Sequence, residues 1–280
     1  MVKRTGWCHY FQRFPASNAH RRYGYRSFFL TFIRATIAGV LALMLVLVSG
    51  TIRPRVTQVV SLISVSLGVI IGFPLLTALA LKHVSSAHSL VFTGLLPLCT
   101  AVFGVLRGGE RPRMAFWVCS VIGSLLIAGF ALSADASVSQ TGDLLMLASV
   151  IACGFGYAEG AKLSREMGGW QVISWALIFS LPFMAIASGL TMQAGFIYIG
   201  YEAWFSLGYV SLFSMFLGFV FWYRGLAAVG VAAVGQLQLL QPFIGLCLSV
   251  ALLHERVTPL MALVTLGVIL CVAGAHKFAR

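Results

Sequence analysis

Long hydrophobic runs alternate with short polar stretches along the chain from about residue 27 to its end. Each run is close to the roughly 20 residues that an α-helix needs to cross a bilayer, and a helix satisfies its own backbone hydrogen bonds in lipid. The polar stretches are short, so consecutive helices must run antiparallel, and no soluble domain fits between them. The pattern predicts an all-α polytopic membrane protein with spans at 28–48, 59–81, 86–106, 115–133, 144–162, 173–190, 203–223, 229–253 and 260–276.

The chain also repeats itself. Shifted by 145 residues, Ala80–Leu132 falls on Gly225–Lys277 without a gap. Chance matches among hydrophobic residues are common, but a mid-helix proline and a loop Glu-Arg pair at one offset are not. The offset pairs Pro97 with Pro242, and Glu110-Arg111 with Glu255-Arg256. We therefore expect a first repeat at 27–133 and a second, five-helix repeat at 142–278, after a polar, basic segment at 1–26.

One helix has no counterpart in this scheme. The run at 144–162 should pair with a run near residues 1–17, but that stretch is too polar to span a membrane. We therefore expect nine helices where the complete arrangement has ten, with the first helix of the first repeat missing.

The basic residues indicate an orientation. Only 9% of the residues are charged, yet the net charge is +12. The Lys and Arg side chains sit mainly at the ends of hydrophobic runs, which argues against a nucleic-acid partner. Loops on one side carry ten of them, against Lys82 and Arg256 on the other. This asymmetry predicts a multi-pass inner (plasma) membrane protein with a cytoplasmic C-terminus, although the basic segment at 1–26 then lies outside, against the rule.

Since a complete repeat has an odd number of helices, the two repeats must have inverted topology, as in many secondary transporters. The sequence resembles the EamA family of the drug/metabolite transporter superfamily over roughly residues 27–277. The resemblance is carried by Phe32-Ile-Arg-Ala35, Leu81-Lys-His-Val-Ser-Ser-Ala87, Gly94-Leu-Leu-Pro97 with Glu110, Gly142-Asp-Leu-Leu145, Arg224-Gly-Leu-Ala-Ala-Val229, Gln241-Pro242 and Leu253-His-Glu255. It implies ten helices, a central cavity lined by both repeats, and export of amino acids or other small metabolites.

Glu159 is the acidic residue that lies within a hydrophobic run, where a charge costs on the order of 3 kcal/mol. It either pairs with Lys162 at the cytoplasmic interface or serves as a proton or cation site. Tyr157 lies on an adjacent turn and is a candidate for the same face.

Other polar and aromatic residues in the runs are candidates for binding or coupling. Arg34 either snorkels or meets a substrate carboxylate. His88 either forms an interfacial hydrogen bond or takes part in proton coupling. Phe92 and Trp175 are candidates for packing against a substrate.

Three glutamines crowd one run ahead of Pro242. Gln238 and Gln241 are three residues apart and share a helix face, where they either join helices or bind substrate. Pro97 and Pro242 are expected to bend their helices around the cavity, because each removes a backbone hydrogen bond.

No catalytic motif, metal-ligand spacing or cofactor-binding loop emerges from the sequence, so we expect neither an enzyme nor a cofactor. The predicted function is a secondary transporter that moves a small-molecule substrate across the bilayer by alternating access, as an exporter. The alternative is a non-transporting or degraded membrane protein derived from such a transporter.

Overall fold

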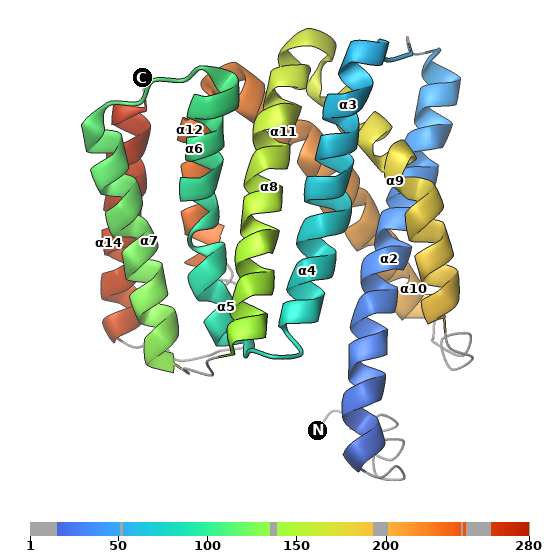
Figure 1. The fold of residues 1–280 in the computed structure, drawn as a ribbon, viewed down its shortest axis with the longest axis horizontal. Helices are drawn as coiled ribbons and strands as arrows, with labels where there is room; N and C mark the ends of the chain where they lie inside the picture. The colour runs from blue at the N-terminus through green and yellow to red at the C-terminus, as the bar shows by residue number, and fades with distance from the viewer. Residues whose placement is uncertain are drawn as a thin grey trace.

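The computed structural model describes residues 16–50, 53–134, 139–192, 201–241, 243–244 and 259–279, and within these ranges it contains helices and no strands (Figure 1). The first repeat comprises α2 (Ala16–Ser49), α3 (Val56–Val65), η1 (Ser66–Gly72), α4 (Phe73–Ala80), α5 (Ser86–Thr93), α6 (Leu96–Gly108) and α7 (Met114–Ala134). The second comprises α8 (Gln140–Met167), α9 (Gly169–Thr191), α10 (Tyr201–Val210), η3 (Ser211–Leu217), α11 (Gly218–Val229), α12 (Val231–Gly235), η4 (Gln236–Leu240) and α14 (Pro259–Phe278).

Every predicted hydrophobic run contains described helix. By length and composition, six of the described helices are able to cross a membrane, and three shorter apolar helices accompany them. The all-α polytopic membrane fold is therefore confirmed. The first helix begins earlier than its hydrophobic run, at Ala16.

Helices that the repeat makes equivalent pack against each other. α2 lies along α9 at one end of the molecule, and α7 lies along α14 at the other end (Figure 1). Between these pairs α6 packs on α12, whose own counterpart under the offset is α5. The members of each pair run in opposite directions across the bundle, as inverted repeats require.

Two wide helical turns obey the same 145-residue offset. The π-helix η1 spans Ser66–Gly72 and the π-helix η3 spans Ser211–Leu217, and 66 + 145 = 211 while 72 + 145 = 217. A π-helix interrupts an α-helix with i→i+5 hydrogen bonds and is rare. Its appearance at equivalent places in both halves is structural support for the repeat. In the first repeat Pro74 lies two residues after the end of η1 and has no N–H to donate to the turn before it.

The broken helix α5–α6 bends where the sequence places a proline. The chain leaves the helix after Thr93 and re-enters it at Leu96, so Pro97 lies in the first turn of α6, where a missing N–H is harmless. Pro242, its counterpart, lies outside the described residues.

Small residues let the central helix α8 approach its neighbours closely. A Cβ atom on Gly68 of η1 would overlap the backbone carbonyl of Ala152, and Gly68 and Gly156 face each other across this contact. Such glycine contacts are the usual way in which membrane helices pack backbone against backbone.

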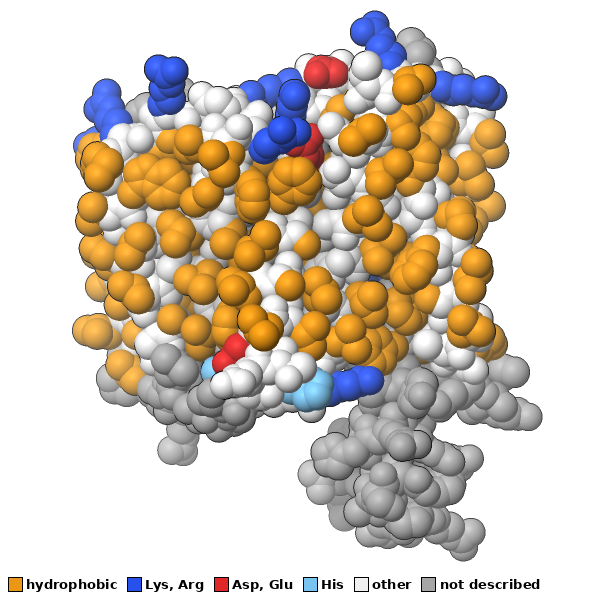
Figure 2. Space-filling view, viewed as in Figure 1, with side chains coloured by type: hydrophobic (Ala, Val, Ile, Leu, Met, Phe, Trp, Pro, Cys, Tyr) orange, Lys and Arg blue, Asp and Glu red, His pale blue; other side chains and the backbone are white. Residues whose placement is uncertain are grey.

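Figure 2 shows Lys and Arg side chains gathered along one edge of the molecule, the edge at which α14 ends (Figure 1). The sides of the bundle between the two edges carry mainly hydrophobic side chains. We call this edge the arginine-rich face; among its residues are Arg107, Arg165, Arg224 and Lys277, each near the end of a helix that terminates there.

Candidate functional site

An aromatic cluster surrounds Tyr157 in the middle of α8. The Tyr157 ring lies 5.5 Å from that of Trp222, 6.4 Å from that of Phe219 and 6.4 Å from that of Tyr223, all on α11 (centroid distances). Tyr223 is fully buried, and its hydroxyl donates to the carbonyl oxygen of Gly156 at 3.5 Å. This cluster holds α11 against α8 and presents polar edges, a phenol and an indole N–H, inside the membrane-spanning bundle.

Amide side chains of η4 join this cluster. The side chain of Gln238 lies close to the Tyr157 hydroxyl, and its own Oε1 is buried without a hydrogen-bond partner among the described residues. Gln241, expected on the same face as Gln238, is exposed.

The most buried amide of this segment belongs to Gln236, for which the sequence predicted no role. Gln236 is fully buried, and neither its Oε1 nor its Nε2 has a hydrogen-bond partner within the described ranges. The segment Gln236–Leu240 is a 3₁₀ helix with three residues per turn, so Gln236 shares its face with the buried Leu239. The sequence signal for Gln236 was the cluster of three glutamines, but α-helical spacing groups Gln238 with Gln241 and leaves Gln236 out, whereas this segment is a 3₁₀ helix.

Two more candidates carry buried donors without a partner among the described residues. These donors are Nε of Arg34 on α2 and the indole N–H of Trp175 on α9, whose ring is tilted against that of Phe179 with the centroids 6.2 Å apart. The indole N–H of Trp222 is also unpartnered among the described residues. Buried polar groups normally find a partner, so such groups mark places where a bound molecule or water is expected.

His88 forms a polar contact at the edge opposite the arginine-rich face. Its Nε2 lies 2.8 Å from Oδ1 of Asp143, in the first turn of α8, and its backbone N–H donates to Ser85 Oγ. Phe92 packs one turn further along α5, with its ring 5.7 Å from the imidazole. His88 and Phe92 therefore lie with Asp143 at the helix ends, away from Tyr157.

The partner of Glu159 is Arg107, so the pairing of Glu159 with Lys162 is wrong. The Glu159 side chain is 1% exposed and its Oε1 accepts from Nε of Arg107, at the end of α6, while Lys162 is exposed. Arg107 also lies over the ring of Phe155, with its Cζ 5.9 Å from the centroid. The carboxylate points from α8 toward α6, away from the surface where Lys162 lies. Its second oxygen, Oε2, is buried without a partner in the described part of the chain.

Glu110 plays a separate role on the arginine-rich face. Its two carboxylate oxygens accept from the backbone N–H groups of Val231, at 2.6 Å, and Ala232, at 2.8 Å. The first repeat thus caps the start of α12 in the second, and this interaction suits a carboxylate at a helix N-terminus.

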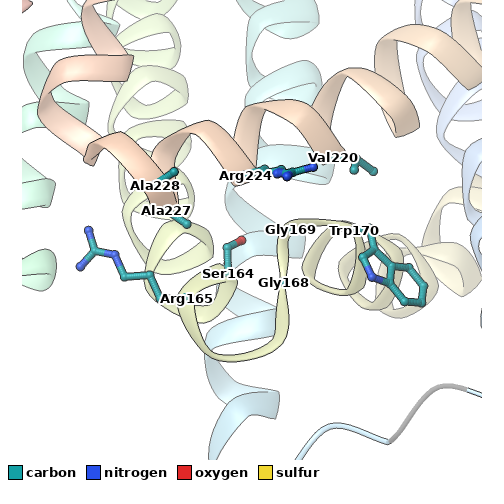
Figure 3. Close-up of a pocket in the computed structure, with 9 residues that line it drawn as sticks. All are labelled: Ser164, Arg165, Gly168, Gly169, Trp170, Val220, Arg224, Ala227 and Ala228. Carbon is teal, nitrogen blue, oxygen red and sulfur yellow. The ribbon is translucent and has the colours of Figure 1, made fainter.

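A groove of about 550 Å³ lies on the arginine-rich face between the α8–α9 corner and α11 (Figure 3). It is lined by Ser164, Arg165, Gly168, Gly169, Trp170, Val220, Arg224, Ala227 and Ala228. The corner can approach α11 this closely because Gly168 has a φ of +87° and a Cβ on Gly169 would lie 2.9 Å from the backbone of α11.

Among the described residues, no group of three or more His, Cys, Asp or Glu side chains is arranged to hold a metal ion.

Comparison with known proteins identifies the fold and the family to which these helices are related. The profile of the EamA-like transporter family matches residues 18–132 and again residues 140–276. The uncharacterized transporter YdeK of Bacillus subtilis (strain 168) is 60% identical over 252 residues, which cover 90% of this chain and 88% of YdeK. The uncharacterized transporter YyaM of the same organism is 20% identical over 267 residues, covering 93% of this chain and 83% of YyaM.

A solved crystal structure shares the fold with a TM-score of 0.75 and 18% sequence identity, covering 89% of this chain and 88% of that one.

Proposed function

Because the chain belongs to the EamA-like transporter family, we propose that it is a secondary transporter rather than an enzyme, and that it exports small metabolites, amino acids or similar compounds, by alternating access. The observation that carries the proposal is the packing of repeat-equivalent helices in antiparallel pairs, α2 with α9 and α7 with α14. Two inverted halves provide two related gates, one on each side of the membrane.

Polar contacts at opposite edges support this reading. His88 and Asp143 join α5 to α8 at one edge, and Arg107 and Glu159 join α6 to α8 nearer the other. Opening on either side then requires some contacts of this kind to separate while those on the other side persist.

We propose the Tyr157 cluster as part of the substrate-binding site. It combines a phenol, the Gln238 amide and the Trp222 indole, and the Gln238 carbonyl and Trp222 N–H have no partner among the residues that the structure describes. Such a surface suits a small molecule that has both an apolar body and hydrogen-bonding groups, as amino acids do. Arg34, with a buried unpartnered Nε, is the candidate for meeting a carboxylate.

We also propose that the arginine-rich face, with the C-terminus, lies in the cytoplasm, because Lys and Arg concentrate on the cytoplasmic side of membrane proteins. Single cysteines at the exposed positions Lys82 and Lys277, in a background without other cysteines, test this orientation in intact cells. K82C is expected to react with a membrane-impermeant maleimide before lysis, and K277C only after lysis. The reverse pattern would refute the orientation.

Transport is best tested with the purified full chain in proteoliposomes, using counterflow of radiolabelled compounds from a panel of amino acids and amines. The expected result is accelerated exchange of at least one compound, with Y157F and Q238A each reducing it. L190A serves as the matched control, because Leu190 on α9 is 81% exposed and faces away from the bundle. Absence of exchange by correctly inserted protein would support the alternative, a membrane protein that does not transport. The direction of transport follows from comparing efflux by cells that express the wild type with efflux by cells that express Y157F.

A further inference from the structure

The groove between the α8–α9 corner and α11 has the features of an anion site. We propose that it binds the phosphate group of an anionic phospholipid from the leaflet that contacts the arginine-rich face. Two cationic residues line it, Arg165 from α8 and Arg224 from α11 (Figure 3). This inference concerns a site outside the Tyr157 cluster and does not depend on which compound is transported.

Both guanidinium groups have N–H donors available for a ligand. Arg224 is exposed and forms no ion pair with the described residues. Arg165 contacts Glu110 at 3.4 Å, but both oxygens of that carboxylate already accept shorter hydrogen bonds from Val231 and Ala232. Since a guanidinium carries five N–H donors, Arg165 keeps most of its donors for a ligand.

A third donor in the groove lacks a partner. Ser164 is 7% exposed, and its hydroxyl has no hydrogen-bond partner in the described part of the chain. Figure 3 shows this side chain directed into the space between the α8–α9 corner and α11. Because a buried hydroxyl normally has a hydrogen-bond partner, the Ser164 hydroxyl is a donor suited to an acceptor atom of a ligand.

The backbone adds to the same donor set. The 23-residue helix α9 begins at Gly169 in the wall of the groove, and the first N–H groups of a helix lack intrahelical partners. A phosphate at this position would meet two guanidinium groups, a hydroxyl and a helix N-terminus, the combination that proteins use for phosphate.

The surroundings favour a lipid phosphate over a free one. Phe221, Arg224 and Ala228 lie at positions i, i+3 and i+7 of α11 and share one helix face, and Phe221 is 69% exposed one turn deeper than Arg224. A phosphate held by Arg224 therefore has an exposed apolar surface directly beneath it, along which an acyl chain would lie. Trp170, in the opposite wall, is of the residue type that concentrates at the headgroup level of membranes.

The test measures lipid binding to the purified full chain by native mass spectrometry, comparing phosphatidylglycerol, phosphatidylcholine and soluble glycerol 3-phosphate. We expect preferential retention of phosphatidylglycerol, and about a fivefold loss of its affinity in each of R165Q and R224Q. S164A is expected to give a smaller loss. R53Q is the matched control, because Arg53 is an exposed arginine of the same face outside the groove.

A further variant separates the two sources of phosphate. F221A should weaken retention of phosphatidylglycerol and leave any binding of glycerol 3-phosphate unchanged. Equal affinities of R165Q, R224Q and R53Q for phosphatidylglycerol would overturn the site. Competition by glycerol 3-phosphate as strong as that by phosphatidylglycerol would overturn the lipid assignment and identify a soluble anion as the ligand. Since the three arginines are exposed, the thermal unfolding midpoints of their variants should match the wild type, which separates a loss of binding from a loss of folding.

Discussion

Replacing Arg107 is expected to destabilise the protein more than replacing Glu159, although both substitutions break the same ion pair. The Glu159 side chain is 1% exposed, whereas that of Arg107 is 47% exposed. In R107Q the carboxylate stays buried without its cation, a situation that costs about 3–5 kcal/mol. In E159Q the guanidinium that remains reaches water, so the loss should resemble that of a surface pair, about 1 kcal/mol.

The two costs predict an asymmetry of about 2–4 kcal/mol between the single variants. They also predict the stability of the double variant. R107Q/E159Q has neither charge, so it should be about as stable as E159Q and clearly more stable than R107Q. Groups in direct contact are expected to show such non-additivity.

The assay is equilibrium unfolding of the purified protein in one detergent, followed by circular dichroism as a denaturing detergent is added. R53Q controls for the loss of an arginine from the same face. Two results would refute the idea that Glu159 is a buried charge compensated by Arg107. One is that R107Q is no less stable than E159Q, and the other is that the double variant loses the sum of the two single losses in stability.

Further expectations concern packing and capping. G160A should lower the thermal unfolding midpoint, because a Cβ there would lie 2.6 Å from Cζ of the buried Tyr223, an overpacking cost of about 1–3 kcal/mol. G189A, where a Cβ meets nothing within 4 Å, should be neutral or slightly stabilising, and equal midpoints for the two variants would contradict the close packing of α8 on α11. E110Q should destabilise by about 1–2 kcal/mol and speed hydrogen exchange at Val231 and Ala232, because it weakens the cap of α12. E166Q, which changes an exposed carboxylate that is hydrogen-bonded to Gln58, is the control and should leave hydrogen exchange at those two amides unchanged. If the two amides stayed protected in E110Q, the Glu110 carboxylate would not be the cap of α12.

The sequence predicted the spans and the repeat because both are encoded locally. Hydrophobic length marks a membrane helix, and the 145-residue offset, found from residues such as Pro97 and Glu110, also relates η1 to η3. The wide turns themselves were not predicted. Pro74 offers a reason for η1, but its equivalent in the second repeat is Phe219, and η3 has no comparable sequence signal.

The hydrophobic pattern could not predict which side chains of different helices contact each other. Helices that are apolar on every side carry little information about which face meets which neighbour. The sequence therefore suggested the nearest cation, Lys162, as the partner of Glu159, whereas the actual partner, Arg107, is 52 residues away in the chain. Gln236 was missed for a related reason, since a change from 3.6 to three residues per turn alters which side chains share a face.

The helix α8 has a consequence for how this molecule is divided into parts. By sequence it opens the second repeat, yet most of its polar bonds reach the first. Asp143 meets His88, Ser149 meets Thr77, Glu159 meets Arg107 and Glu166 meets Gln58. The sequence repeat therefore changes before α8, whereas the packing changes after it, between α8 and α9. A chimaera that exchanged whole repeats with a relative would sever these bonds, whereas one with its junction between α8 and α9 would inherit them intact.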